Sequence, residues 1–445
     1  MNKTYKIPAR DISLNDSYDV IIAGGGPAGC AAAIAASREG ASVLLIEQSG
    51  ALGGMGTGGL VPFWAPFSDG EKIVYRSIAE EVFTALKKSM PEIVDKDAVD
   101  WVSINSENLK CIYDDLVKGS GADILFNTFV TDVNMRGRYI DSIITANKQK
   151  LTSYRAKIYI DCTGDADIAA WAGCDFHKGN DKGSLQAATL CFALANVDMD
   201  EYMAHSPMHS DSSNSIIHKI VASGKYPSIK EAHMCIKPIG GDVIGINAGH
   251  IWGVDNTKPV SVSKGLIEGR KYAHELRRAL AETLPEVFGK SLVVMTAPLL
   301  GVRETRRIVG DYTLNIDDYI ARRTFEDEIG RNCYFVDVHR APGEDENSPE
   351  AQQRHYGRGE SHGIPYRCLI PKDADNLLVA GRCISTDRPM QGSMRVMPAC
   401  LVTGEAAGRA AAIAAAHGDN TRDIDIRELR TRLIKNGAYI KLLQN

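Results

Sequence analysis

Short apolar runs and stretches of small residues alternate at the start of the chain. The run Tyr18–Ala23 is apolar and rich in β-branched residues, which predicts a buried strand. Very small residues fill Cys30–Ser37, which predicts a closely packed helix that ends at Gly40. A second apolar run, Ser42–Glu47, predicts another buried strand. Because strand, helix and strand follow one another within about thirty residues, we expect a βαβ unit and a parallel sheet.

The hydrophobic pattern changes after residue 60 and returns to this rhythm only near the C-terminus. No βαβ rhythm recurs between about 171 and 371, so this middle stretch predicts a separate α+β region. The later elements are marked by apolar residues at helical spacing or in short runs. The expected helices lie at 77–88, 107–118 and 398–416, and the expected strands at 124–127, 139–146, 156–161 and 376–381.

The turn after the first strand carries the spacing Gly24-x-Gly26-x-x-Gly29. The first glycine permits the tight turn, the second lets a phosphate approach the backbone, and the third lets the helix pack closely against the strand. The N-terminus of the helix offers N–H groups and positive potential to a pyrophosphate. Glu47 ends the second strand, where an acidic residue binds ribose hydroxyls and disfavours the 2′-phosphate of NADP. The motif therefore predicts a dinucleotide site.

Elements of the nucleotide-binding type lie at both ends of the sequence. The predicted fold class is α/β, with a Rossmann-like parallel-sheet domain that is discontinuous and carries an inserted α+β substrate domain. The expected boundaries are 17–62, 105–175 and 370–418 for the sheet domain, 63–104 and 176–369 for the substrate or cap domain, and 419–445 for a C-terminal helical tail.

Composition and charge narrow the class of protein. The 445 residues are 44% apolar and 24% charged, which is typical of a soluble globular protein. The net charge of −5 gives no electrostatic footprint for nucleic acid or an anionic membrane. We recognise no apolar run long enough to span a bilayer and no signal peptide. The ten cysteines lack any C-x-x-C spacing, so we expect reduced packing residues in a cytoplasmic protein.

Further motifs are spread along the chain. They are the second glycine loop Gly53–Thr57, Cys162–Ala166, Gly301–Arg307, Ile364–Arg367, Asn376–Arg382 and Ser393–Pro398. Together with the first glycine motif and Glu47, they resemble the FAD-dependent oxidoreductases with the glutathione-reductase-type FAD-binding fold. The sequence is most similar to the family related to the fumarate reductase and succinate dehydrogenase flavoproteins. The resemblance implies FAD as the cofactor, and it makes the discontinuous domain an FAD-binding domain.

The resemblance also implies that FAD is bound non-covalently. Covalent relatives attach the flavin through a histidine just before the second glycine loop, and the stretch Glu47–Gly53 contains none. The helix that starts near Pro398 resembles the one whose N-terminus faces the flavin, where its dipole stabilises negative charge on the reduced ring. The residues expected to contact FAD are Gly24, Gly26, Pro27, Ala28, Gly29, Glu47, Gln48, Gly53, Gly54, Met55, Thr57, Val130, Thr163, Gly164, Asp165, Gly381, Arg382, Arg395 and Ala399.

Three arginines form a dense basic cluster around Glu304. Arginine forks bind carboxylates through two hydrogen bonds, so Arg303 and Arg307 are candidates for holding an anionic substrate. If this segment is helical, these two side chains share one face and Arg306 lies beside them. The alternative is a salt-bridged domain junction. Arg395, which precedes the last long helix, is a further candidate for contact with the flavin ring or a substrate anion.

The segment Asp337-Val-His339 is a candidate acid–base pair. Its carboxylate and imidazole fall on one side of an extended segment, and the carboxylate would orient the imidazole and raise its basicity. His362 and Tyr366, in a glycine-rich loop, are alternative catalytic residues, as is His250. Each histidine also has an ordinary structural interpretation. No spacing of histidine and acidic residues suggests a metal, so no metal site is expected.

A second strand–G-x-G-x-x-G–helix unit and a redox cysteine pair are absent, which disfavours a built-in NAD(P)H domain. We therefore predict an FAD-dependent dehydrogenase or reductase that transfers a hydride between the flavin and a small polar substrate, anionic or hydroxylated. The electron donor or acceptor, the substrate and the oligomeric state are left open. Two alternatives also stay open. They are an RNA-modifying flavoprotein, which needs a basic face, and a non-catalytic FAD-binding redox module, which needs no substrate cleft.

Overall fold

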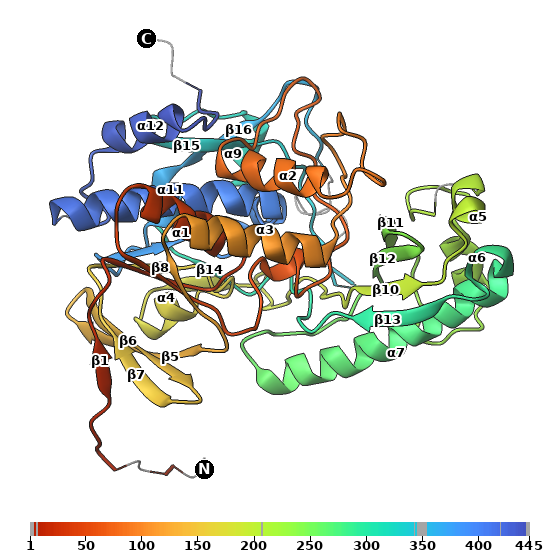
Figure 1. The fold of residues 1–445 in the computed structure, drawn as a ribbon, viewed down its shortest axis with the longest axis horizontal. Coiled ribbons are helices and arrows are strands. Elements are labelled where there is room, and N and C mark those ends of the chain that lie inside the picture. The colour runs from red at the N-terminus through yellow and green to blue at the C-terminus, as the bar shows by residue number, and fades with distance from the viewer. Residues whose placement is uncertain are drawn as a thin grey trace.

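The computed structural model describes residues 4–5, 8–205, 208–341, 343–344, 354–418 and 420–441 (Figure 1). A five-stranded parallel sheet lies at its centre, in the order β17-β8-β2-β3-β4. Its strands are β2 (Val20–Ala23), β3 (Val43–Ile46), β4 (Asp123–Leu125), β8 (Ile158–Asp161) and β17 (Leu377–Val379). Because β17 pairs with β8, the last third of the chain completes a sheet that the first part begins. The predicted α/β class with a Rossmann-like parallel sheet is confirmed.

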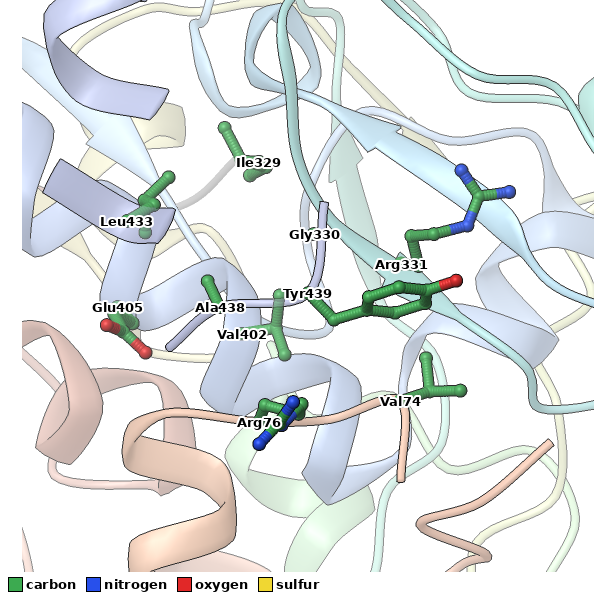
Figure 2. Close-up of a pocket in the computed structure, with 10 residues that line it drawn as sticks. All are labelled: Val74, Arg76, Ile329, Gly330, Arg331, Val402, Glu405, Leu433, Ala438 and Tyr439. Carbon is green, nitrogen blue, oxygen red and sulfur yellow. The ribbon is translucent and has the colours of Figure 1, made fainter. Parts of the chain in front are cut away.

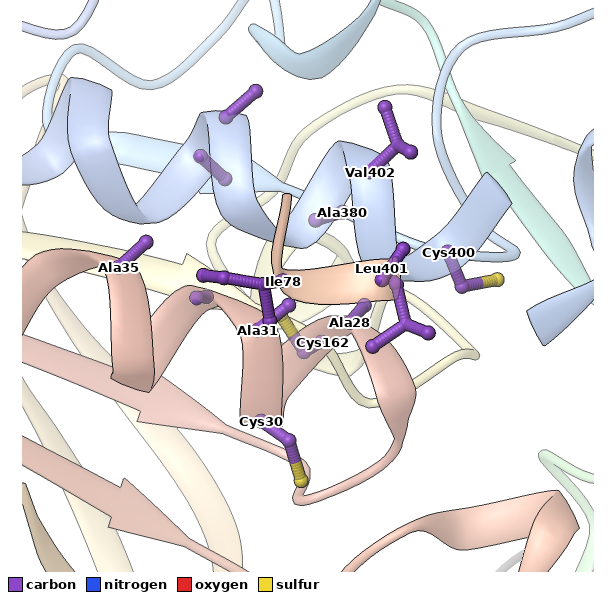
Figure 3. Close-up of a cluster of buried hydrophobic side chains, with 14 of the residues drawn as sticks. Ala28, Cys30, Ala31, Ala35, Ile78, Cys162, Ala380, Cys400, Leu401 and Val402 are labelled. Atoms are coloured by element: carbon purple, nitrogen blue, oxygen red, sulfur yellow. The ribbon is translucent and has the colours of Figure 1, made fainter. Parts of the chain in front are cut away.

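Two long helices pack against each other beside this sheet (Figure 3). They are α1 (Pro27–Arg38) and α11 (Met397–His417). A Cβ atom added to Gly404 of α11 would lie 2.1 Å from the carbonyl oxygen of Ala28, and one added to Gly408 would lie 2.2 Å from that of Ala32. Glycine at both positions is therefore what lets the two helix backbones touch. The small residues of α1, recognised in the sequence, form the other side of this contact.

Helix α11 is long and apolar enough to cross a membrane, and it is the one such helix among the described residues. Its most apolar window is 94% buried inside the fold, so its composition matches its position packed against α1 and the central sheet. Helices α2 (Ile78–Lys88) and α3 (Ser106–Gly119) pack near α1 on the same side. Helix α3 begins at a side-chain cap, because the Asn105 side chain accepts hydrogen bonds from two backbone N–H groups.

A smaller sheet, β1-β7-β6-β5, lies on the other side of the central sheet (Figure 1). Its strands are β1 (Ser13–Asn15), β5 (Phe129–Arg136), β6 (Tyr139–Asn147) and β7 (Lys150–Tyr154). The middle of the sequence builds a separate antiparallel sheet, β11-β12-β10-β13. Its strands are β10 (Phe192–Ala195), β11 (Met234–Gly240), β12 (Val243–Ala248) and β13 (Leu292–Thr296).

Helices cover this antiparallel sheet, and together they enclose a second hydrophobic core. They are α5 (Met199–Ala204), α6 (Ile216–Ala222), α7 (Pro259–Thr283) and α8 (Pro285–Phe288). Phe192, Leu276 and Phe288 are completely buried in this core. The middle of the chain therefore forms an α+β region with its own core. The exact domain boundaries stay a prediction.

The remaining elements complete the structure. They are strands β9 (Phe176–Lys178), β14 (Arg306–Ile308), β15 (Glu328–Asn332) and β16 (His362–Pro365), helices α4 (Asp167–Trp171), α9 (Ile316–Ile320), α10 (Arg388–Met394) and α12 (Ile426–Lys435), and the short 3-10 turns η1 (Gly54–Gly56) and η2 (Tyr366–Leu369). The segment with the three arginines is not helical, so the shared helix face considered for Arg303 and Arg307 does not exist. Arg306 and Arg307 lie in β14, which pairs with β9, and on a strand neighbouring side chains point to opposite faces.

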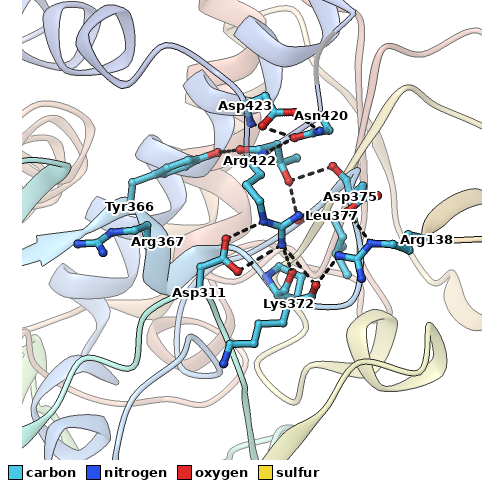
Figure 4. Close-up of polar contacts among 12 residues, drawn as sticks. Arg138, Asp311, Tyr366, Arg367, Lys372, Asp375, Leu377, Asn420, Arg422 and Asp423 are labelled. Carbon is cyan, nitrogen blue, oxygen red and sulfur yellow. Dashed lines mark hydrogen bonds and ion pairs between the residues drawn. The ribbon is translucent and has the colours of Figure 1, made fainter.

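The segment after α11 is fastened to the edge of the central sheet by a polar network (Figure 4). Arg422 donates hydrogen bonds to Asp311 at 2.7 Å and Asp375 at 3.1 Å. The hydroxyl of Tyr366 donates to the backbone carbonyl of Thr421 at 2.7 Å. Tyr366 is buried and committed to this network, so its contacts are those of a structural residue.

Candidate functional site

The first glycine loop lies at the carboxyl end of β2, and each glycine has a distinct steric reason. Gly24 has a positive φ of 97°, and a Cβ there would lie 2.4 Å from the Cys162 carbonyl oxygen. A Cβ on Gly29 would lie 1.7 Å from the carbonyl oxygen of Gly24. Within the described part of the chain, a Cβ on Gly26 would meet no atom within 4 Å. The space at Gly26 is therefore open at the N-terminus of α1, where a phosphate would bind.

The second glycine loop rests on the first. The N–H of Gly53 donates to the carbonyl of Gly25 at 2.8 Å, and a Cβ on Gly54 would lie 3.0 Å from the Gly26 Cα. A Cβ on Gly56 would lie 3.1 Å from the sulfur of Met397, the first residue of α11. The two loops and the start of α11 thus meet at one place, although several hundred residues separate α11 from the loops in the sequence.

Glu47 closes the same place from the end of β3. Its side chain is buried, and its two carboxylate oxygens accept from the N–H groups of Gly25 at 2.6 Å and Ser49 at 2.7 Å. The backbone carbonyl of Glu47 accepts from Thr128, two residues before Val130. An acidic side chain held against the glycine loop fits the ribose-binding position of a dinucleotide.

A third loop follows β8 and contains Thr163, Gly164 and Asp165. The Asp165 carboxylate pairs with Arg382 at 2.7 Å and accepts from the Thr305 hydroxyl at 2.5 Å. The Nη1 atom of Arg382 is buried and lacks a hydrogen-bond partner among the described residues. An anionic or carbonyl-bearing ligand would accept a hydrogen bond from this unused, buried donor.

The other predicted cofactor residues surround these loops. Gly381 has a positive φ of 88°, its N–H donates to Thr403 of α11 at 3.1 Å, and a Cβ there would lie 3.1 Å from that of Ala28. Ala399 lies in the first turn of α11. Pro27, Gln48, Met55 and Thr57 lie in the loops and helix start already described. The open space at Gly26, the buried Glu47 and the unused Arg382 donor fit a dinucleotide cofactor.

A cluster of ionisable side chains lies near the start of α11. Asp337 and His339 leave the extended segment after β15 and contact each other, with Nε2 of His339 3.2 Å from a carboxylate oxygen. Arg395, the residue after α10, donates to the Asp337 side chain at 2.8 Å. Nδ1 of His339 lies 2.6 Å from Nε2 of His250. Three sequence-predicted candidates and the alternative His250 are thus brought together.

Arg303 completes this charged cluster from the segment before β14. Its guanidinium donates to the carbonyl of Ala187 at 2.7 Å and to the Thr189 hydroxyl at 3.0 Å. Burial, together with the positive charge of Arg395, lowers the pKa of Arg303 to about 10. The guanidinium is therefore fully charged at pH 7, in a place where a substrate anion would be bound strongly.

The pKa values in the cluster keep its carboxylate charged and its imidazole neutral at pH 7. Burial raises the pKa of Asp337, but the nearby His339 and Arg395 hold it well below the usual range. Burial and the charge of Arg303 lower the pKa of His339 to about 3. Neutral His339 therefore has a lone pair available on one ring nitrogen.

Two members of the cluster were missed in the sequence. His233 stacks on His250 with ring centroids 4.4 Å apart, and Glu231 places a carboxylate oxygen 2.6 Å from Nδ1 of His250. Glu231-Ala-His233 repeats the acid-x-His spacing of Asp337-Val-His339, and this repeat is the signal that could have drawn attention to it.

Two hydrogen-bonding residues connect this cluster to α10. The amide of Gln391 in α10 donates to the Arg303 carbonyl at 2.7 Å, and Gln186 donates to the Gln391 side chain at 2.7 Å. The side-chain oxygen of Gln186 also accepts a hydrogen bond from the backbone N–H of His339 at 3.1 Å. Since α10 leads directly into α11, whose first residue touches the second glycine loop, the charged cluster lies beside the predicted cofactor site.

Arg307 and His362 lie elsewhere. Arg307 pairs with the buried Glu304, which also accepts from Arg388 at 3.1 Å. This arrangement matches the salt-bridged junction that was the alternative interpretation of the arginine cluster. His362 is completely buried in β16, where its Nδ1 lies 2.7 Å from the Tyr356 hydroxyl. The geometry joins neither residue to the charged cluster, and their catalytic roles stay predictions.

The buried His362 predicts an acid-sensitive fold. Burial lowers the pKa of His362 to about 3, whereas the unfolded chain has its ordinary value of 6.5. Between these values the unfolded chain binds a proton that the folded chain does not, so this residue makes stability fall as the pH falls below about 6.5, by about 1–2 kcal/mol at pH 5. We expect His362→Gln to lose less stability than the parent chain between pH 7 and 5 in urea denaturation. Equal losses would contradict the prediction.

A small cavity lies away from the site, beneath the last turn of the chain (Figure 2). Arg331, Val402 and Tyr439 are among its lining residues, and its volume is about 10 Å³. That volume holds roughly one water molecule, so the cavity is too small for a substrate.

Comparison with known proteins identifies a family and several similar folds. A family model described as FAD dependent oxidoreductase matches residues 19–433. The fold is similar to that of a geranylgeranyl bacteriochlorophyll reductase-like protein from Thermoplasma acidophilum, at 14% identity and a TM-score of 0.45, with 96% of this chain and 83% of that chain covered. It is also similar to p-nitrophenol 4-monooxygenase from Pseudomonas putida, at 9% identity and a TM-score of 0.46, with 96% and 85% covered.

Proposed function

This chain belongs to the FAD-dependent oxidoreductase family, and we propose that it transfers a hydride between FAD and a small organic substrate that is anionic or hydroxylated. The observation that carries the proposal is the charged cluster formed by Arg303, Asp337, His339 and Arg395 beside the two glycine loops. Buried positive side chains bind an anion strongly. The neighbouring imidazole pair is partly exposed and can exchange a proton with that anion.

FAD is the cofactor, and when bound it supplies two-electron chemistry by accepting or donating a hydride. In our proposal the N-terminus of α1 at Gly26 binds the pyrophosphate and Glu47 binds the ribose. Arg382 supplies a hydrogen-bond donor. We propose that binding is non-covalent, as the resemblance implies, because covalent relatives use a histidine before the second glycine loop and this chain has none between Glu47 and that loop. The same proposal includes three finer points. They are the relationship to glutathione-reductase-type and fumarate reductase flavoproteins, the two-domain boundaries and a cytoplasmic location.

The two arginines are proposed to hold the substrate. Arg395 pairs with Asp337 through its Nη2, while its Nε is buried and has no hydrogen-bond partner within the described residues. Arg303 is held by a carbonyl and a hydroxyl, neither of which neutralises its charge. A substrate carboxylate between these groups would satisfy a buried donor and offset a buried charge, which is why an anionic substrate is favoured.

His339 is proposed to manage the proton. Because its pKa is lowered to about 3, the imidazole is neutral at pH 7 and can accept a proton. Asp337, which stays charged, would stabilise the imidazolium so formed. Proton transfer onward to His250 needs no large movement, because the two ring nitrogens are 2.6 Å apart.

An anaerobic titration tests this function. FAD-loaded protein is mixed in turn with NADH, NADPH, hydroxy acids, sugars and enoates, and the flavin absorption band is followed before and after air is admitted. We expect an anionic or hydroxylated compound to bleach the band or to reoxidise a reduced flavin. A protein that takes up no FAD would refute the proposal. Bleaching only in the presence of RNA would favour the RNA-modifying alternative, and no redox response to any compound or partner would favour the non-catalytic one.

Arg395 provides a sharper test once a substrate is identified. Arg395→Met removes a charge-assisted contact, so we expect the substrate concentration for half-maximal bleaching to rise about 10- to 100-fold. Arg138→Met is the matched control, because Arg138 pairs with Asp375 in the network at the far edge of the sheet. An unchanged substrate concentration in Arg395→Met, with FAD still bound, would exclude Arg395 from substrate binding.

A further inference from the structure

Three imidazole rings converge in the charged cluster. His233 precedes β11, His250 follows β12 and His339 lies in the segment after β15, so the three come from separate parts of the sequence. One ring nitrogen from each lies within 4.8 Å of the other two. We call these residues the three-histidine cluster. No spacing along the sequence could reveal it, which is why no metal site was expected.

Two carboxylates lie beside the cluster, one near each of two rings. Nδ1 of His250 lies 2.6 Å from Glu231, and Nε2 of His339 lies 3.2 Å from Asp337. An ion bound to the opposite nitrogens of these two rings would leave each ring N–H on the side of its carboxylate.

The two opposite nitrogens face each other. Nε2 of His250 and Nδ1 of His339 are 2.6 Å apart, a distance at which one of them donates a hydrogen bond to the other when no ion is bound. His233 stacks on His250, and its own Nδ1 is buried without a hydrogen-bond partner in the part of the chain that the structure describes. Each of the three rings thus offers a nitrogen that a metal ion could take as a ligand.

We propose that the three-histidine cluster binds a divalent transition-metal ion of the kind that imidazole prefers, with zinc as the reference ion. Histidine ligands that donate their other N–H to a carboxylate are typical of metal sites, and two of the three have such a carboxylate. A tetrahedral zinc ion holds ligand nitrogens about 3.3 Å apart. The separations here bracket that value, and His233 would have to turn out of its stack on His250 for its nitrogen to reach the ion.

The surrounding charges permit an ion at this place. Arg303 and Arg395 contribute two positive charges, and Asp337 and Glu231 contribute two negative ones. The side chains of His250 and His339 keep 10% and 15% of their surface exposed, which leaves one side of the cluster open. Three protein ligands and an open position are the arrangement of catalytic rather than structural zinc sites.

This inference rests on the proposed function and deepens it. The ion would bind an oxygen atom of the anionic or hydroxylated substrate and fix it beside Arg303 and Arg395. A proton and the ion compete for the same nitrogens of His250 and His339. If the ion is bound, His250 and His339 would hold it, and the ion would make a water molecule or substrate hydroxyl beside them more acidic, while His339 would handle the proton in the chain without the ion.

The test is metal binding to the FAD-loaded protein. Protein freed of metals with a chelator is titrated with Zn²⁺ in a calorimeter, and with Co²⁺ while its absorption beyond the flavin band is recorded. We expect one ion per chain. His233→Ala should weaken binding at least 10-fold, and the milder Glu231→Gln, which keeps the fold and the shape of the side chain, should weaken it about 10- to 100-fold.

His205→Ala is the matched control, because His205 also lies beside two glutamates but outside the cluster. It should bind the ion as the parent chain does. The inference would be overturned if the parent chain bound no stoichiometric ion, or if His233→Ala and Glu231→Gln bound the ion as tightly as the parent chain. The contact between His250 and His339 would then be explained by a proton shared between their nitrogens. A yellow protein that responds to substrate but binds no ion would refute the metal site alone. A protein that binds the ion but no FAD would refute the proposed function.

Discussion

Gly26→Asp is expected to abolish FAD binding while leaving the fold intact. Gly26 is the N-cap of α1, with φ −70° and ψ −175°, a conformation that any residue adopts, and the space beyond it is open among the described residues. Aspartate is a favoured N-cap residue, so the stability of the chain without FAD should be unchanged or slightly higher. The new carboxylate would occupy the position of a pyrophosphate oxygen. Placing like charges together costs several kcal/mol, so the affinity for FAD should fall at least about 100-fold.

The measurements are the flavin content of the purified protein, the Kd for added FAD and the thermal midpoint without FAD. Gly119→Asp is the control. Gly119 also has open space around it in the described structure, but it ends α3 far along the helix from the glycine loops. That variant should bind FAD as the parent chain does. If Gly26→Asp kept its flavin, the pyrophosphate would bind elsewhere and the proposed site would be wrong.

Gly404→Ala is expected to destabilise the protein by about 3 kcal/mol or more. The added Cβ would lie 2.1 Å from the carbonyl oxygen of Ala28 and 2.7 Å from its Cα, both of which are backbone atoms that no side-chain rotation can move away. Helix α11 must therefore shift away from α1. Since α1 begins at the first glycine loop, the shift should also weaken FAD binding.

The same substitution at an open position should change the stability of the protein in the opposite direction. Gly119 lies in α3 and has no atom within 4 Å of an added Cβ, as far as the structure is described. Gly119→Ala should be neutral or stabilising by up to about 1 kcal/mol, because alanine favours helix. Urea denaturation gives the free energy of unfolding of both variants. It compares a methyl group pressed against a neighbouring backbone, in Gly404→Ala, with the same methyl group in open space, in Gly119→Ala. If Gly404→Ala were as stable as Gly119→Ala, the close packing of α1 on α11 would be refuted.

The sequence predicts the central sheet well because its signals are local. The strand before Gly24, the helix of small residues and the strand that ends in Glu47 each occupy a few consecutive residues. The parallel pairing then follows from the short crossover. Even the helix after Pro398, far along the chain, carries its own signal, because a run of alanines and glycines favours a buried helix. Most errors are shifts of one or two residues at the ends of elements.

The candidate site could be predicted only in part. Asp337 and His339 are two residues apart, so an extended segment brings them together without any help from the rest of the fold. His250 meets His339 across 89 residues, and only the tertiary structure makes that contact. The sequence did not reveal that Arg306 lies in a strand, because local spacing cannot show that β9 is there to pair with it. Contacts between distant segments leave no periodic pattern in the sequence.

The pairing of α1 with α11 has a consequence for synthesis of the protein. The apolar face of α1 leaves the ribosome early, but the helix that covers it ends at residue 417. At about 5–20 residues per second, the nascent chain therefore carries an uncovered helix and an incomplete sheet edge at β8 for tens of seconds. Folding of the cofactor-binding half must therefore await the synthesis of α11, and the apolar helix and open strand edge exposed in that interval favour aggregation.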